Sequence, residues 1–177
     1  MLSYRKCTIS DLEILTKVSK ETFIDAFEKD NNPVDFQNYI QQAFSIKKIT
    51  TELKNPNSHF YFVFDDNTLV GYFKLNTESA QTDVHDPTAL EIERIYVLKE
   101  HQGKKIGAWM LQEIISLAHK MEKTFIWLGV WEHNTNAIRF YQRHGFQKFD
   151  EHPYFIGDDK QTDWLLRIRL KDFPQEH

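Results

Sequence analysis

The stretch Ile95–Ala108, IYVLKEHQGKKIGA, passes from an apolar, strand-like segment through a glycine-bearing turn directly into a helical pattern. A turn of this kind points free backbone N–H groups and the positive end of a helix dipole outward, which suits a phosphate or pyrophosphate. Lys104 and Lys105 add positive charge at the same place. The spacing fits neither a P-loop nor the Gly-x-Gly-x-x-Gly fingerprint, and two lysines in a turn are often only a solvated surface.

The segments on either side place this turn inside a β-α-β unit. Residues 90–98 have the composition of a strand, residues 104–121 carry an apolar stripe at helical spacing, and residues 125–131 are apolar at every position. The last pattern is typical of a strand that is buried on both faces. A strand, a helix and a strand joined in this way predict a right-handed parallel unit.

The remaining segments predict the rest of one mixed sheet. Ser10, followed by Glu13, is typical of the N-terminal cap of a helix, and Asn134 and Gly145 bracket another helix. The other expected elements are a strand at 4–9, helices at 11–28, 34–43, 46–54 and 134–144, an antiparallel hairpin of strands at 59–64 and 69–75, and strands at 146–152 and 161–170. We therefore expect an α/β (or α+β) fold in a single domain over residues 1–177, with a mixed central sheet of about seven strands.

Composition limits the classes of function. Of 177 residues, 41% are hydrophobic and 14% aromatic, which supplies a packed core. The formal charge of −4 disfavours nucleic acid as a partner, because proteins that bind it neutralise phosphates with a basic surface. With one cysteine, Cys7, and no apolar signal core or 18-residue apolar run, we expect a cytoplasmic protein that uses neither an internal disulfide nor a membrane. The eight histidines show no metal-ligand spacing, so we expect no metal.

Three linked motifs resemble the GCN5-related N-acetyltransferase (GNAT) superfamily. They are the turn Gln102–Gly107 after a strand, a second strand through Trp127–Trp131, and a helix segment Asn134–Phe146, NTNAIRFYQRHGF, that carries Tyr141. The turn departs from the family pattern at Lys105, which stands where the first glycine of the pattern is usual. Over nearly its whole length the chain is similar to the PaiA group of bacterial spermidine/spermine N-acetyltransferases, whose members have also carried the label of transcriptional regulator.

The resemblance implies acetyl-CoA as the cosubstrate. The pantetheine arm would lie along the strand through Ile95, Tyr96 and Val97, held by backbone hydrogen bonds, and Asn134 would contact the same arm. The pyrophosphate would lie on the turn, at Gln102, Gly103, Lys104, Lys105, Ile106, Gly107 and Ala108. Most of these contacts use backbone N–H groups, so the shape of the turn matters more than its side chains.

Direct acetyl transfer needs a neutral amine and a proton for the departing thiolate. The resemblance implies that Tyr141 protonates or hydrogen-bonds the thiolate; a core tyrosine is the alternative. For the base we prefer Glu91 or Glu93, because Glu91 lies eleven residues before Gln102, the offset at which protein-acetylating members hold a glutamate that acts through water. The alternatives are a strand-end surface residue for Glu91 and, for Glu93, an ion pair with Arg94 or Lys74.

Two acidic stretches favour a cationic acceptor, if the opening helices and last loops line the acceptor site as in the family. The acids are Glu78, Asp83, Asp86, Glu91 and Glu93 in one stretch and Glu21, Asp25, Glu28, Asp30 and Asp35 in the other. Tyr72, Phe73 and Tyr154 would offer apolar contact to methylene groups. The resemblance thus predicts acetylation of a primary amine of spermidine or spermine.

Other functions stay open at this point. An aminoglycoside, a peptide lysine or a protein N-terminus would suit the same acidic stretches. A transcriptional regulator would need a basic helix, and the most basic one, residues 139–148, already carries Tyr141. The sequence leaves the oligomeric state open, with a homodimer through the aromatics of the last strands as one option.

Overall fold

A single mixed sheet organises the chain. The computed structural model describes residues 1–175, and within these the sheet has seven strands in the order β1-β2-β3-β4-β5-β7-β6. The strands are β1 (Leu2–Lys6), β2 (Ser58–Asp65), β3 (Thr68–Asn76), β4 (Ala89–Val97), β5 (Phe125–Trp131), β6 (Gln147–Ile156) and β7 (Asp159–Arg169). The α-helices are α1 (Leu12–Phe27), α2 (Pro33–Ala43), α3 (Ile46–Lys54), α4 (Ile106–Lys120) and α5 (Thr135–Arg143). The α/β fold with a mixed central sheet, expected from the sequence, is confirmed.

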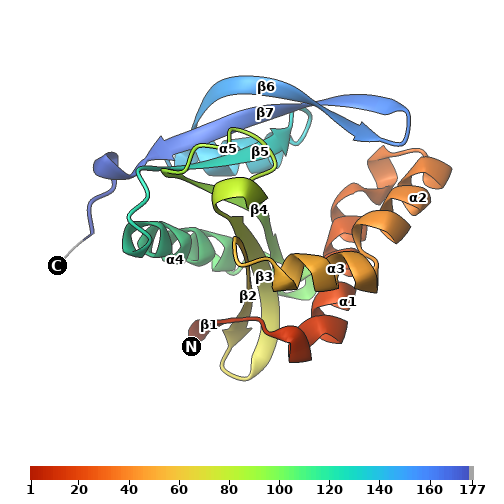
Figure 1. Cartoon of the computed structure of the whole chain (residues 1–177), viewed down its shortest axis with the longest axis horizontal. Coiled ribbons are helices and arrows are strands. Elements are labelled where there is room, and N and C mark those ends of the chain that lie inside the picture. Colours follow the sequence, from red (N-terminus) through yellow and green to blue (C-terminus); the bar gives the residue numbers. More distant parts are fainter. Residues whose placement is uncertain (176–177) are drawn as a thin grey trace.

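The sheet splits between β4 and β5. These strands are parallel neighbours, as the β-α-β pattern predicts, but they pair only from Ala89 opposite Phe125 to Glu91 opposite Trp127. Opposite β3, the register of β4 shifts so that Glu93 is an extra residue. A bulge of this kind bends its strand and increases the local twist. Figure 1 shows the result: β5, β6 and β7 cross the top of the view while β2 and β3 run down from it.

Helices cover both faces of the sheet. On one face, α4 buries Met110 and Ile114 against Leu75 and its neighbours. On the other face, α1, α2 and α3 bury residues such as Leu15 and Phe36 against Phe60. The alternation along β2 explains this division, because successive side chains of a strand point to opposite faces. Figure 1 shows α4 on one side of the strands and α1 to α3 on the other.

The hairpin of β6 and β7 reaches across to α2. Its turn approaches so closely that a Cβ on Gly157 would lie 2.7 Å from Cγ of Asp35. Farther along the hairpin, Gln161 Nε2 donates to Asn31 Oδ1 at 2.8 Å. The hairpin therefore connects the divided sheet to α2 and the segment just before it, and Figure 1 shows its turn close to α2.

Several boundaries differ from the sequence prediction. The first strand, expected at 4–9, spans Leu2–Lys6 instead, because Ile9 already belongs to a 3-10 turn that leads into α1. The expected cap at Ser10 is wrong: Thr8 N donates instead to Asp11 Oδ2 at 2.8 Å, and Arg5 binds the same carboxylate. The expected strands at 146–152 and 161–170 are in fact longer and meet in a tight turn at residues 157–158. The cause is that β6 is mostly exposed, so its polar residues do not show the apolar pattern of a buried strand.

Candidate active site

A cleft of about 430 Å³ opens where β4 and β5 part. Its walls come from β4 and β5, from the start and middle of α5, from α1 and α2, and from the β6–β7 hairpin. Among the residues predicted from the sequence, the cleft brings together Glu91, Glu93, Ile95, Tyr96, Asn134 and Tyr141. Val97 and the turn 102–108 lie outside its lining.

The glycine-bearing turn presents an uncapped helix N-terminus. Within the described residues, no side chain caps α4, which begins at Ile106 after a left-handed residue, Lys105, with φ of 61°. Gly103 is also left-handed, with φ of 79° and open space around it. Lys105 thus keeps the backbone shape that glycine adopts easily, at a strain of about 1 kcal/mol. The free N–H groups at this helix end can donate hydrogen bonds to an anion.

Helix α5 positions two of the predicted residues. Asn134 caps the helix as expected: its Oδ1 accepts a hydrogen bond from Ala137 N at 3.3 Å. Tyr141 lies in the last turn of the helix and is 9% exposed, with its ring against Phe140 and Phe146. Burial raises the pKa of the Tyr141 phenol far above its usual value, and its hydroxyl has no hydrogen-bond partner within residues 1–175. The cleft is therefore lined by a neutral phenol that is free to donate.

Glu91 is enclosed at the point where β4 and β5 stop pairing. It is 2% exposed, so the alternative of a surface residue is wrong. Its carboxylate accepts hydrogen bonds from Asn76 Nδ2 at 2.9 Å, from Thr82 N at 2.8 Å and from Thr82 Oγ1 at 2.5 Å. Burial raises the pKa of Glu91, and the hydrogen bonds from Asn76 and Thr82 oppose that rise. Within the described part of the chain no cation faces this carboxylate.

Glu93, the bulge residue, forms the ion pair considered as its alternative. Its carboxylate contacts the Lys74 ammonium and accepts from Asn76 Nδ2 at 3.0 Å. Lys74 in turn donates to Glu52 Oε2 at 3.1 Å. Burial works against ionisation of Glu93, but the nearby cations Lys74 and Arg94 prevail and lower its pKa. Lys74 and Arg94 carry two positive charges and Glu52 and Glu93 carry two negative charges, so this cluster is neutral overall.

The sequence reasoning missed a polar group at the end of the cleft nearest α2 and the β6–β7 hairpin. Asp163 on β7 lines the cleft with Tyr39 and Tyr154, whose hydroxyls hydrogen-bond to each other. Burial raises the pKa of the Asp163 carboxyl to about 6. No sequence signal singled it out, because Asp163 ends the polar stretch KQTD that precedes the run WLLRI.

The opening helices contribute apolar rather than acidic groups. Phe23, Phe27 and Tyr39 line the cleft, whereas none of the described acids between residues 21 and 35 does. Tyr72 and Phe73 were expected to touch the acceptor, and this is wrong because both are fully buried in the core. In the other acidic stretch, Asp83 reaches the cleft together with Glu91 and Glu93, and Asp83 is paired with His152.

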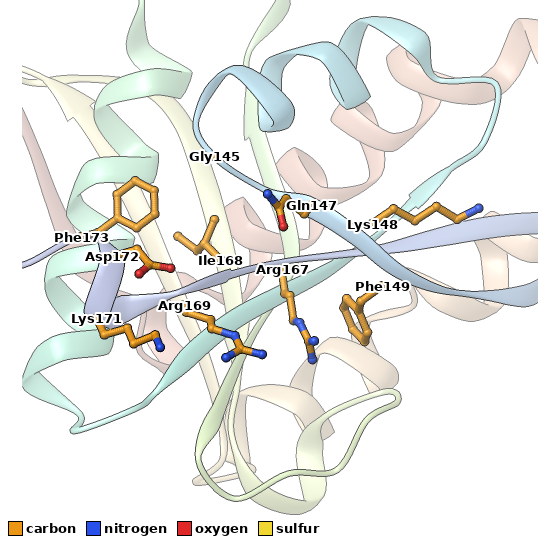
Figure 2. Close-up of a pocket in the computed structure, with 10 residues that line it drawn as sticks. All are labelled: Gly145, Gln147, Lys148, Phe149, Arg167, Ile168, Arg169, Lys171, Asp172 and Phe173. Atoms are coloured by element: carbon orange, nitrogen blue, oxygen red, sulfur yellow. The ribbon is translucent and has the colours of Figure 1, made fainter.

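A second hollow, of about 380 Å³, lies at the far end of β6 and β7. Figure 2 shows Arg167 and Arg169 side by side on β7, with Lys171 just beyond them and Phe149 next to Arg167. The Arg167 guanidinium stacks on Phe149, 4.7 Å from the ring centre. This basic hollow contains none of the site residues predicted from the sequence.

The described residues contain neither a metal-binding cluster nor a membrane-spanning helix. No group of three His, Cys, Asp or Glu side chains in residues 1–175 is arranged to hold a metal ion. Over the same residues, no helix combines the length and the apolar character needed to cross a bilayer. The single cysteine, Cys7, is buried, and desolvation raises the pKa of its thiol to about 12.

Known proteins resemble this chain in sequence. The family model described as Acetyltransferase (GNAT) family matches residues 15–146. A Lactobacillus delbrueckii subsp. lactis protein, named an uncharacterized N-acetyltransferase, is 41% identical over 160 residues, or 90% of this chain and 92% of that protein. The spermidine N(1)-acetyltransferase of Thermoplasma acidophilum is 26% identical over 153 residues, or 84% of this chain and 90% of that protein.

A solved structure resembles the chain in fold. The PaiA N-acetyltransferase from Thermoplasma acidophilum, crystallised in complex with coenzyme A, matches with a TM-score of 0.76 and 24% identity. The match covers 96% of this chain and 99% of that one. Because the match covers nearly all of both chains, it includes the strands on both sides of the split between β4 and β5.

Proposed function

Because the chain belongs to the acetyltransferase (GNAT) family, we propose that it transfers the acetyl group of acetyl-CoA to a primary amine of a polyamine such as spermidine or spermine. The observation that carries the proposal is the cleft between β4 and β5. A neutral phenol lines it on the α5 side, carboxylates line its interior, and strand β4 in its wall leads along the chain to the uncapped start of α4. Amine acetylation by acetyl-CoA needs three things. The phenol would supply an acid for the thiolate, the helix end a binding site for the phosphates, and the carboxylates a negative potential for a cationic amine.

The residues around the cleft fit acetyl-CoA, which supplies an activated acetyl thioester. We assign the pyrophosphate to the turn from Gln102 to Ala108. There the free N–H groups of α4 and the left-handed Lys105 form an anion-binding site. We assign the pantetheine arm to β4 at Ile95–Val97, because β5 no longer pairs with β4 there. Asn134 lies across the cleft from that strand and would contact the same arm.

Tyr141 is the proposed acid. When the C–S bond of the thioester breaks, its phenol would donate the proton, or the hydrogen bond, that the departing thiolate needs. The support is that the hydroxyl has no partner among the described residues and that burial keeps the phenol protonated. Tyr141 would then regain a proton from the attacking nitrogen, which carries a positive charge once it bonds to the acetyl carbon and loses that charge as the amide forms.

Glu91 and Glu93 are the proposed catalytic carboxylates, with unequal roles. A base works best when its pKa lies near the working pH, and burial moves the pKa of Glu91 upward while the cations around Glu93 move its pKa downward. We therefore propose that Glu91 accepts the amine proton through a water molecule and that Glu93 adds negative potential. Three hydrogen bonds hold the Glu91 carboxylate in place for that role.

The charge of the cleft supports a cationic acceptor. Glu52 and Glu93 offset Lys74 and Arg94, and His152 faces Asp83. Glu91 and Asp163 are left as carboxylates with no cation among the described residues, so the cleft carries negative potential that favours an ammonium ion. The spermidine acetyltransferase of Thermoplasma acidophilum, similar over most of the chain, makes polyamines the first acceptors to test.

An assay of thiol release against an amine panel tests the proposal. Acetyl-CoA would be offered with spermidine, spermine, putrescine, a lysine peptide and an aminoglycoside, and we expect turnover with the polyamines. Turnover with the peptide or the aminoglycoside alone would keep the reaction and replace the acceptor. Binding of acetyl-CoA without turnover of any amine, together with sequence-specific retention of DNA at physiological salt, would favour a regulator instead.

A further inference from the structure

The structure leaves one carboxylate of the cleft without a partner. Four carboxylates line the cleft, and three of them are engaged: Asp83 by His152, Glu91 by Asn76 and Thr82, and Glu93 by Lys74. The fourth, Asp163, has neither a hydrogen bond nor an ion pair within residues 1–175. Asp163 is half-buried and its carboxylate is not closed off from solvent, so a cationic group that enters the cleft can reach it.

The place of Asp163 in the sheet aims it at the cleft. It pairs with Trp131 on β5 and with His152 on β6, so these three side chains share one face of the sheet. Diagonally across β5 lies Gly129, which is exposed and has no side chain to cover the carboxylate; a Cβ there would lie 3.4 Å from Asp163 Oδ2. One oxygen of Asp163 therefore faces open space over Gly129.

The groups around Asp163 do not neutralise it. His152 is the nearest cation on β6, and its ring is taken by Asp83 and Asp150. The hydroxyls of Tyr39 from α2 and Tyr154 from β6 bind each other. On β4, the remaining charges, those of Glu93 and Arg94, belong to the balanced cluster with Lys74 and Glu52. Among the described residues, no cation therefore forms an ion pair with this carboxylate.

We infer that Asp163 is the counter-ion for a second ammonium group of the acceptor, one that does not react. The inference rests on the proposed function and narrows its substrate class to amines that carry at least two positive charges. The reacting nitrogen must lose its charge before it attacks the thioester, whereas a carboxylate that only binds keeps both partners charged. Tyr39 and Tyr154 next to Asp163 would cover the methylene groups between the two nitrogens.

Putrescine and butylamine provide a matched pair of probes, because they have the same carbon chain and differ by one ammonium group. Calorimetric titration of each amine into the protein with coenzyme A measures binding without needing turnover. We expect putrescine to bind the wild type at least about 10-fold more tightly than butylamine, the scale of one charge-assisted hydrogen bond. In Asp163→Asn the difference should shrink to about twofold or less, and Asp163→Glu should restore part of it.

Asp158→Asn is the control, since Asp158 is an exposed carboxylate in the turn of the same hairpin and lies outside the cleft. The Asp158→Asn variant should keep the full preference for putrescine. As a check on folding, the melting temperature of Asp163→Asn should equal or exceed that of the wild type. A wild type that binds both amines equally, or an Asp163→Asn variant that keeps the preference, would overturn the inference. A preference that depends on Asp163 without any amine turnover would leave the inference standing and reject the proposed acetylation.

Discussion

Gly129 on β5 lies beneath the carboxylate of Asp163 on β7: a Cβ at position 129 would be 3.4 Å from Asp163 Oδ2 and 3.6 Å from a methyl group of Leu165. Both distances correspond to van der Waals contact, so a methyl group at position 129 would fit and would fill the space beside the carboxylate. The space over Gly129 is the open side of an otherwise covered acid. The two residues are 34 positions apart in sequence and meet because β5 and β7 are antiparallel neighbours.

Gly129→Ala tests whether this space is used. We expect the variant to fold, because Gly129 has no positive φ and its neighbours can accommodate one methyl group. The KM for a polyamine should rise about 3- to 10-fold, while the KM for acetyl-CoA changes little. If Gly129→Ala raised the KM for acetyl-CoA as much as the KM for the polyamine, the space over Gly129 would not be specific to the amine.

Asp163→Asn should stabilise the protein at neutral and alkaline pH. The folded-state pKa of about 6 exceeds the ordinary value of 3.8, so the folded protein holds this proton more tightly than the unfolded chain does. Its contribution to stability is therefore present below about pH 4 and is lost as the pH rises through 6. A two-unit shift is worth roughly 3 kcal/mol, which contact with solvent reduces to about 1–2 kcal/mol.

Urea unfolding of the wild type and Asp163→Asn at pH 4.5 and pH 8 measures this effect. The asparagine variant should gain free energy of unfolding at pH 8 and lose most of that gain at pH 4.5. The exposed Asp158→Asn should change neither value by more than about 0.5 kcal/mol. If Asp163→Asn were less stable than the wild type at pH 8, Asp163 would have a partner that the structure does not show.

Tyr141→Phe should separate catalysis from binding. Removal of the phenol hydroxyl takes away the proposed proton donor, so kcat should fall by about 100-fold or more, the usual scale of acid catalysis. The affinity for acetyl-CoA should stay within about twofold, because the ring remains in the core with Phe140 and Phe146. Tyr61→Phe is the matched control: Tyr61 is also buried, but it packs against Tyr4 and Phe73, away from the cleft.

Lys105→Gly should relieve strain at the start of α4. Lys105 adopts φ of 61°, which costs a residue with a Cβ about 1 kcal/mol and costs glycine nothing. We expect thermal unfolding to show a gain of up to about 1 kcal/mol, with a change of less than about threefold in acetyl-CoA affinity. Lys104→Gly should show no gain, since Lys104 has no positive φ. A loss of acetyl-CoA binding only in Lys105→Gly would mean that the side chain, rather than the backbone, holds the phosphates.

Local patterns predicted the elements of the cofactor half of the fold well. The helical stripe after the glycine turn, the apolar strand Phe125–Trp131 and the cap at Asn134 all correspond to observed elements. Each of these signals is contained in fewer than twenty consecutive residues. The apolar strand was expected to be buried on both faces, yet Gly129 is exposed because β4 has already parted from β5 at that point.

The residues proposed to contact the amine could not be predicted from local sequence patterns. Asp163 becomes notable only through the register of β7 with β5 and β6, a relationship between residues far apart in sequence. The acids of residues 21–35 looked like a lining because their charge is visible in sequence, but α1 turns Phe23 and Phe27 toward the cleft. The roles of Tyr141, Glu91 and Glu93 stay predictions, supported by their place in one cleft.

Mass spectrometry of the product formed from acetyl-CoA and spermidine tests the central claim most directly. We predict that the wild type yields N-acetylspermidine and an equal amount of free coenzyme A, and that Tyr141→Phe yields both at least about 100-fold more slowly. Tyr61→Phe should match the wild type. A wild-type protein that binds acetyl-CoA but leaves spermidine, spermine and putrescine unacetylated would contradict the account.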